Sequence, residues 1–162
     1  MSEVSRPAVV SFGSAVAVLA TLALGVAAGA MLAEGAVLVP WWRSMPPEAF
    51  LRWYGENARR LFEFYGPLEI VSATLTLLAA VVHRPSRRWF VGAALLALAV
   101  LAAFPIYFRD VNASFESGAI GVDRVHAELG RWAAWHWGRT MLGLLAFALS
   151  MLGVRAEARR IR

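Results

Sequence analysis

The chain has 162 residues, 59% of them hydrophobic, and a formal net charge of +5. This apolar fraction is too high for an ordinary soluble domain and is typical of a single membrane bundle. Cysteine is absent, which excludes disulfides and thiolate metal sites. All 16 basic residues are arginines, without a basic stripe or an RNA-binding motif. Arginines flanking apolar segments therefore explain the charge better than a nucleic-acid partner does.

Four apolar segments predict an all-α, polytopic four-helix bundle whose partner is the lipid bilayer. A helix needs about 20 apolar residues to cross a membrane. The segments that come near this length are residues 9–39, 66–82, 89–108 and 135–154. Because neither a repeat nor a linker divides the chain, we expect residues 1–162 to form one transmembrane domain. The first segment exceeds the core of a signal peptide, so we expect a retained helix.

The first span combines a small-residue face with a terminal charge. An alanine face leads to Glu34, which is therefore expected to point into the bundle. Gly25 and Gly29 lie on the opposite side with small-xxx-small spacing, which favours close helix packing. The sequence Pro-Trp-Trp-Arg at residues 40–43 is expected to end this helix at an aromatic belt. Most other tryptophans and tyrosines are expected to anchor the membrane interface in the same way.

Residues 47–65 are predicted to form an amphipathic helical segment between the first two spans. Pro46, Pro47 and Glu48 form a helix-start signal. Aromatic and aliphatic residues occupy one side of the segment, whereas arginines and glutamates occupy the other. The segment either lies in the membrane interface or runs into the second span with a kink near Pro67.

The second and third spans differ in polarity. One stripe of the second span carries Glu69, Ser72, Thr76 and His83, and it should face the bundle because lipid does not solvate these groups. A short basic turn at residues 83–88 follows. The third span is almost purely aliphatic until Pro105, which is expected to kink or end the helix. Residues 117–121 are expected to form a loop before the helix that becomes the fourth span.

The arginine distribution favours one orientation. Four spans place the N-terminus, the 83–88 turn and the C-terminus on one side, with eight arginines on each side of the membrane. The arginines are densest in the shortest turn and the C-terminal tail. This density predicts a multi-pass protein of the cell inner membrane with both termini in the cytoplasm.

Polar residues of all four spans, or of their ends, are expected to gather in the non-cytoplasmic half. They are Glu34, Glu69, Asn112, His136 and Arg139. Ionisable groups inside a membrane are candidates for function. Structural alternatives remain for each of them: an ion pair that holds the bundle, a hydrogen-bonded interface histidine, a carboxylate reaching headgroup water, or an asparagine that caps a helix.

We expect no metal and no other cofactor. Glu34, Glu69 and His136 would make a mixed carboxylate and histidine set suited to iron or zinc. However, the Glu-x-x-His pairs of di-iron bundles are missing from the sequence. His126 and His136 lie ten residues apart on one predicted helix, so one haem cannot bridge them.

The chain resembles the anthrone-oxygenase-like family of small four-helix membrane proteins, a domain of unknown function. The resemblance rests on residues 25–40 with the following Trp-Arg-Ser-Met-Pro, on Val111-Asn112, and on Arg131-Trp132, His136 and Arg139-Thr140. It covers most of the chain. It implies roles for Asn112, Trp132, His136 and Arg139, and, as in some fungal members, oxidation of a polycyclic aromatic anthrone by molecular oxygen.

Two classes of function follow. In the first, a hydrophobic aromatic compound enters from lipid and stacks on Trp132, Trp135 or Tyr65, near Glu34 and Glu69. His136 then acts as a base, Arg139 stabilises an oxyanion, and Asn112 completes a site that needs no cofactor.

In the second class, the protein is a non-catalytic structural or assembly subunit, as a homo-oligomer or within a larger membrane complex. An accessible cavity near His136 favours the first class, and a side-chain-filled bundle favours the second. A transporter is the weakest alternative because the chain lacks inverted repeats.

Overall fold

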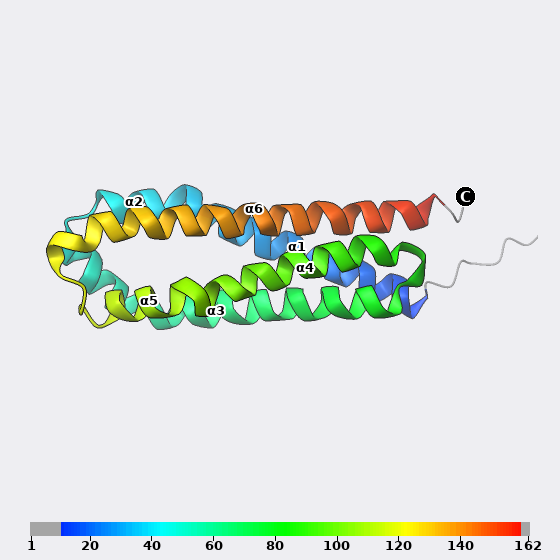
Figure 1. Ribbon diagram of the computed structural model, residues 1–162, viewed down its shortest axis with the longest axis horizontal. Helices are drawn as coiled ribbons and strands as arrows, with labels where there is room; N and C mark the ends of the chain where they lie inside the picture. Colours follow the sequence, from blue (N-terminus) through cyan, green and yellow to red (C-terminus); the bar gives the residue numbers. More distant parts are fainter. Residues whose placement is uncertain (1–10, 160–162) are drawn as a thin grey trace, which may run out of the picture.

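Four long helical stretches run antiparallel to one another in a computed structural model that describes residues 11–159 (Figure 1). The first comprises α1 (Phe12–Ala33), the π-helix η1 (Glu34–Leu38) and α2 (Val39–Ser44), and the second is α3 (Pro47–Val82). The third comprises the 3-10 helix η2 (Arg84–Ser86), α4 (Arg87–Ala103), the π-helix η3 (Phe104–Phe108) and α5 (Arg109–Glu116). The fourth comprises the 3-10 helix η4 (Val122–Arg124) and α6 (Val125–Ala158).

Each stretch is long and apolar enough to cross a membrane, and the described part of the chain contains no strand. The predicted all-α four-helix bundle is thereby confirmed, and the chain is a multi-pass membrane protein. Helix α1 packs against α3 and α6, and α4 packs against the same two helices. Each of the four stretches therefore has two neighbours around a common axis.

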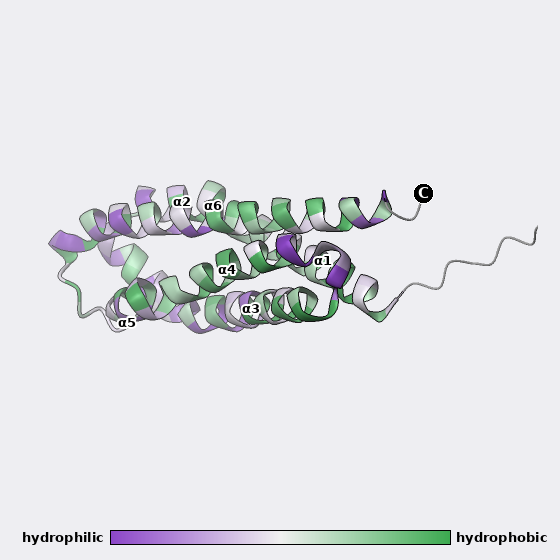
Figure 2. Ribbon diagram, turned by 45° about the vertical axis from the view of Figure 1, so that its right-hand side comes forward, coloured by the Kyte–Doolittle hydropathy of each residue, from purple (hydrophilic) through white to green (hydrophobic). Residues whose placement is uncertain are grey.

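Small residues fill the core of the bundle in the half that contains the beginning of α1 and the end of α6. The buried positions there are mainly alanines, such as Ala17, Ala20 and Ala93. Large aliphatic residues instead point outward, with Leu22 61% and Leu95 64% exposed. Figure 2 shows hydrophobic residues recurring along the helices in this half. Lipid, rather than protein, is therefore expected to cover many of the large apolar side chains here.

The two glycines of the first helix behave differently. A Cβ atom added at Gly25 would lie 3.0 Å from the ring of Phe147 on α6, whereas one added at Gly29 would meet nothing within 4 Å. Gly25 thus allows the close helix approach that the sequence predicts, and Gly29 does not take part in it.

The other half of the core is aromatic. Trp42, Phe50, Tyr54, Phe115 and Trp132 are buried together, and Trp42 contacts Trp132 at 5.5 Å between ring centroids. Trp42, Tyr54 and Trp132 therefore pack into the core of the bundle and are not interfacial anchors, whereas Trp41, Trp135 and Trp137 are exposed.

Prolines do not interrupt the helical stretches. Helix α3 passes through Pro67 without a break, so the amphipathic segment runs directly into the second span. Its six charged residues, at positions 48, 52, 56, 59, 60 and 63, are all exposed. Pro105 lies inside η3, and the chain stays helical to Glu116. The wider π turn accommodates a residue that has no N–H group to donate.

Candidate functional site

Three helical stretches bring their buried charges together in the middle of the bundle. Glu34 opens η1, Glu69 lies on α3, and Arg139 lies on α6; they are 3%, 7% and 7% exposed. Arg139 Nη1 is 3.2 Å from Glu69 Oε1, and Arg139 Nη2 is 3.5 Å from Glu34 Oε2. One guanidinium group is thus shared between two carboxylates. Glu34 points into the bundle, as its place on the alanine face predicts.

The helical repeat of α6 places Trp132, His136 and Arg139 on one buried face. Gly35, next to Glu34, lets α6 approach η1 closely. A Cβ atom at Gly35 would lie 3.1 Å from His136 Nε2 and 3.3 Å from the ring of Trp137. A larger residue at this position would push the histidine and the charged residues apart.

His136 is completely buried and both of its nitrogens face groups of the protein. Nε2 is 2.8 Å from the carbonyl oxygen of Met31, so Nε2 carries the hydrogen and donates it. Nδ1 is therefore the acceptor, 3.5 Å from Arg139 Nη2, and it lies 3.6 Å from Glu34 Oε2. His136 consequently connects the backbone of α1 to the charged residues.

The third stretch contributes an amide and an aromatic ring. Asn112 Oδ1 accepts a hydrogen bond of 2.9 Å from Trp132 Nε1, which leaves the amide N–H groups of Asn112 for another partner. The guanidinium of Arg139 lies over the ring of Phe108, 4.5 Å from its centroid, a favourable cation–π arrangement. All four stretches therefore contribute to one centre.

A cavity of about 600 Å³ lies beside this centre, mainly between α3 and the third stretch. Its polar floor includes Glu34, Glu69 and Arg139, with Trp132 and Asn112 at their side. Its walls are largely apolar and comprise Tyr54, Ala58, Leu61, Phe62, Tyr65, Gly66, Ile70, Leu101, Phe104, Phe108 and Ala113. The volume falls within the range of about 300–1,000 Å³ that is typical of small-molecule sites.

The rim of the cavity is apolar on one side and charged on the other. Phe62 and Ile70 are 58% and 57% exposed on the outer surface of α3, and the Phe62 ring lies 5.9 Å from that of Phe104. Arg109 and Glu116 line the part of the cavity nearer the loop end of the bundle. The cavity is therefore amphipathic, with lipid-facing residues at one part of its rim.

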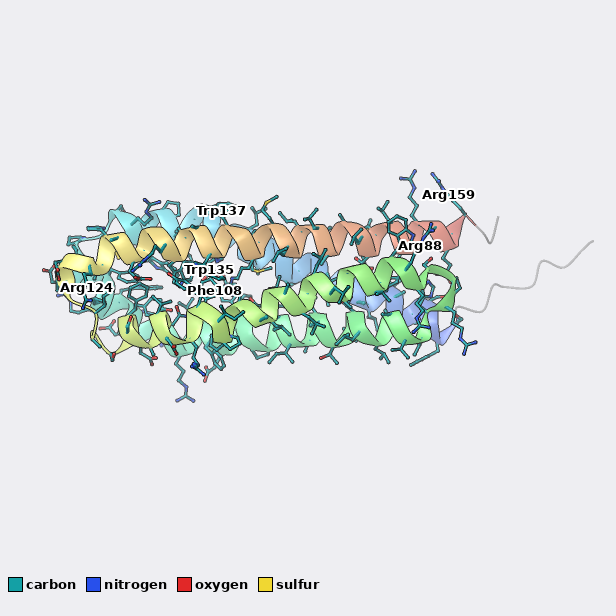
Figure 3. The ribbon with its side chains drawn as sticks, viewed as in Figure 1. Arg88, Phe108, Arg124, Trp135, Trp137 and Arg159 are labelled. Atoms are coloured by element: carbon teal, nitrogen blue, oxygen red, sulfur yellow. The ribbon has the colours of Figure 1, made fainter. Side chains whose placement is uncertain are left out.

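Two predicted site residues do not line this cavity. His136 lies behind Trp132, and the two rings are stacked with centroids 5.0 Å apart. Trp135 stacks on Tyr107 at 4.9 Å and lines a shallow groove between α4 and α6 instead (Figure 3). The other predicted residues do line the cavity: Glu34, Tyr65, Glu69, Asn112, Trp132 and Arg139.

Several aromatic residues of the cavity were missed in the sequence. Tyr54, Phe62, Phe104 and Phe108 line it, but they were not among the predicted residues. Phe108 precedes Asn112 by four residues, and this spacing places both on one face of a helix. This spacing could not be used as evidence of a shared face because Pro105 was expected to kink or end the helix just before Phe108.

Two buried polar atoms at the floor of the cavity have no hydrogen-bond partner. They are Glu69 Oε1, which has only the charge contact with Arg139, and Arg139 Nε. An unsatisfied buried polar group costs about 1–3 kcal/mol, so the charge cluster beside the cavity is left with one unpaired acceptor and one unpaired donor among residues 11–159. Within residues 11–159, no group of three or more histidine, aspartate and glutamate side chains could hold a metal ion.

The fold and this centre define a class of protein: a four-helix membrane bundle with a buried charge cluster beside an amphipathic cavity. No protein-family model, curated protein or solved structure matches the chain. The resemblance to anthrone-oxygenase-like proteins therefore stays a prediction.

Proposed function

We propose that this membrane protein binds a hydrophobic aromatic compound from the bilayer and oxidises it with molecular oxygen. The observation that carries the proposal is the cavity of about 600 Å³, with largely apolar walls and three buried charged side chains at its floor. Aromatic rings along the walls suit a planar aromatic ligand. The charged floor suits a polar substituent, such as a carbonyl group, at one end of that ligand.

The cavity favours this function over a purely structural role. A charged side chain at the centre of a bilayer costs about 2.5–3.5 kcal/mol. A bundle held together by an arginine and a glutamate would need only one carboxylate and no space beside the pair. Here a second carboxylate is present, and Glu69 Oε1 has no hydrogen-bond partner.

The family resemblance suggests the reaction. An activated methylene group of the ligand becomes a carbonyl group. One atom of molecular oxygen becomes the carbonyl oxygen, and the other leaves as water with the two methylene hydrogens. Removal of a proton gives a carbanion that is stabilised as an enolate. Arg139 and the amide of Asn112 both line the cavity and would stabilise the negative oxygen.

The proposal can be tested by adding anthrone, as the probe ligand, to the purified protein in detergent. We expect saturable binding in equilibrium dialysis and oxygen uptake with one molecule of water and one of anthraquinone formed per oxygen molecule. Arg139→Gln should lower the rate by about 100-fold or more, whereas Glu56→Gln, at an exposed site outside the cavity, should not change it. Absence of both binding and turnover would contradict the proposal and favour a non-catalytic subunit.

We also propose that both termini face the cytoplasm across the cell inner membrane. The end of the bundle that contains η2 and the end of α6 carries exposed arginines at positions 84, 87, 88, 155 and 159, with Arg88 and Arg159 labelled in Figure 3. Three of them lie within the short turn at residues 83–88. Arginines concentrated in short loops favour the cytoplasmic side.

The absence of cysteine makes the orientation easy to measure. Single substitutions Arg84→Cys and Ser117→Cys place one thiol at each exposed end. In intact cells, a membrane-impermeant maleimide should label Ser117→Cys and leave Arg84→Cys unlabelled until the membrane is permeabilised. The reverse pattern would overturn the orientation.

A further inference from the structure

We propose that Glu69, and not His136, is the base that removes the ligand's proton, and that the ligand binds as a neutral carbon or oxygen acid. This inference rests on the proposed function and assigns the proton-transfer step within it. It comes from the positions of the two side chains relative to the cavity.

The position of the Glu69 carboxylate suits a general base. It lies on α3 at the floor of the cavity, with its side chain 8% exposed. Among residues 11–159, its Oε1 atom has no hydrogen-bond partner and faces Arg139, shielded from solvent. A general base must come within about 2.6–3.2 Å of the proton donor, and the Glu69 side chain lines the cavity, where a ligand would meet its carboxylate.

His136 lacks such access. Its Nε2 donates to the carbonyl oxygen of Met31, and its Nδ1 faces Arg139 and Glu34 inside the bundle. Trp132 lines the cavity and stacks on the imidazole, with 9° between the two ring planes. The indole thus covers the histidine on the cavity side. His136 is consequently a positioning residue that acts through Glu34 and Arg139.

Glu34 is less suited to the role than Glu69. Its Oε2 atom faces both Arg139 Nη2 and His136 Nδ1, at 3.5 and 3.6 Å. Glu34 thereby fixes the guanidinium from the side of η1 and α6, whereas Glu69 approaches it from α3. Both carboxylates contact Arg139, but only Glu34 also faces His136, so Glu69 has fewer contacts within the protein.

The charge balance of the site specifies the ligand class. Two carboxylates share one guanidinium, so an anionic ligand would bring a third negative charge into a buried site. A neutral acid avoids this cost. Its C–H or O–H bond breaks, the proton bonds to the Glu69 carboxylate, and the electron pair stays on the ligand. The total charge of the site is unchanged, while the negative charge moves from Glu69 to a ligand atom near Arg139.

Hydrogen–deuterium exchange separates this step from oxidation. Under nitrogen in D₂O, the loss of the methylene proton signal of anthrone is followed by NMR, with protein-free micelles giving the background rate. We expect Glu69→Gln to lower the protein-dependent exchange rate by about 100-fold or more while anthrone still binds. His136→Gln, which keeps a donor toward Met31, should lower exchange by less than about tenfold, and Glu56→Gln should leave it unchanged.

A second variant and a second probe keep the test decisive. Glu69→Asp restores a carboxylate, so it should regain part of the exchange that Glu69→Gln loses. The anion 9-anthracenecarboxylate should bind at least about tenfold more weakly than anthrone. Tighter binding of this anion would overturn the inference that the ligand is neutral.

Other outcomes distinguish the inference from the function on which it rests. If Glu69→Gln keeps its exchange while His136→Gln loses it, Glu69 is not the base, and the proposed function stands. The same conclusion follows if the wild-type protein binds and oxidises anthrone without exchange under nitrogen. If the wild-type protein does not bind anthrone, the proposed function and this inference fail together.

Discussion

The indole of Trp132 stacks on the imidazole of His136, with ring centroids 5.0 Å apart and planes at 9°. The same indole donates a hydrogen bond to Asn112. Trp132 therefore links a histidine held against α1 to an asparagine on α5, and it forms part of the cavity wall between them. The histidine lies behind this ring and does not line the cavity, whereas Glu69 does.

Removing the positive charge from the centre should destabilise the bundle. Arg139→Met leaves Glu34 and Glu69 buried without a counter-charge, which typically costs about 3–5 kcal/mol. Thermal denaturation in detergent should show a lower Tm. The triple variant that also carries Glu34→Gln and Glu69→Gln should recover most of this loss. If the single variant is as stable as the wild type, the ion pairs do not hold the bundle.

The hydrogen bond between Asn112 and Trp132 should contribute to both stability and binding. Asn112→Leu removes the acceptor and leaves the indole N–H of Trp132 unsatisfied, at a cost of about 1–3 kcal/mol. Asn112→Asp keeps an acceptor oxygen and should lose less stability. Chemical denaturation and anthrone binding by equilibrium dialysis measure the two effects. Equal stability of the leucine and wild-type proteins would show that this hydrogen bond is dispensable.

Two glycines provide a matched test of helix packing. A Cβ atom at Gly153 would lie 2.8 Å from Phe90 Cε2 and 3.2 Å from Trp89 Cβ, so Gly153→Ala should destabilise the bundle by about 1–3 kcal/mol. Gly29 has nothing within 4 Å of such an atom. Gly29→Ala should therefore be neutral or stabilise the helix by up to about 1 kcal/mol. The Tm values of the two variants should move in different directions, and a common shift would argue against the close contact of α4 with α6.

Filling the cavity should block binding without unfolding the protein. Ala113 on α5 lines the cavity and its surface is exposed, so Ala113→Phe places a ring inside the space. We expect its affinity for anthrone to fall by at least about tenfold, which corresponds to about 1.4 kcal/mol. Ala102→Phe, at an exposed position outside the cavity lining, is the control and should bind like the wild type. Equal affinities of the two variants would locate the ligand elsewhere.

The fold could be predicted from the sequence because the length and hydropathy of each apolar segment identify it as a membrane span. The charged centre could be predicted as well, since Glu34, Glu69 and Arg139 are each costly to place in lipid and therefore turn toward one another. In the same way, the polar stripe of α3 predicts which side of this helix is buried.

The cavity and the orientation of His136 could not be read from the sequence. The hydrogen bond from His136 to Met31 depends on how far α6 rotates and how closely it approaches η1, which is set by Gly35. The aromatic lining depends on η3, where Pro105 is absorbed in a π turn rather than ending the helix. Neither the rotation of a helix nor the width of a turn appears in hydrophobic periodicity.

Helix α3 has 36 residues, and at about 1.5 Å per residue it measures roughly 54 Å. A hydrocarbon layer of about 30 Å covers little more than half of that length. The half with exposed arginines and glutamates is therefore expected to extend beyond the hydrocarbon layer. The cavity beside it would then lie at the boundary between lipid and water. Under the proposed function, this geometry gives a product more polar than its precursor a separate route to water, past Arg109 and Glu116 rather than past Ile70.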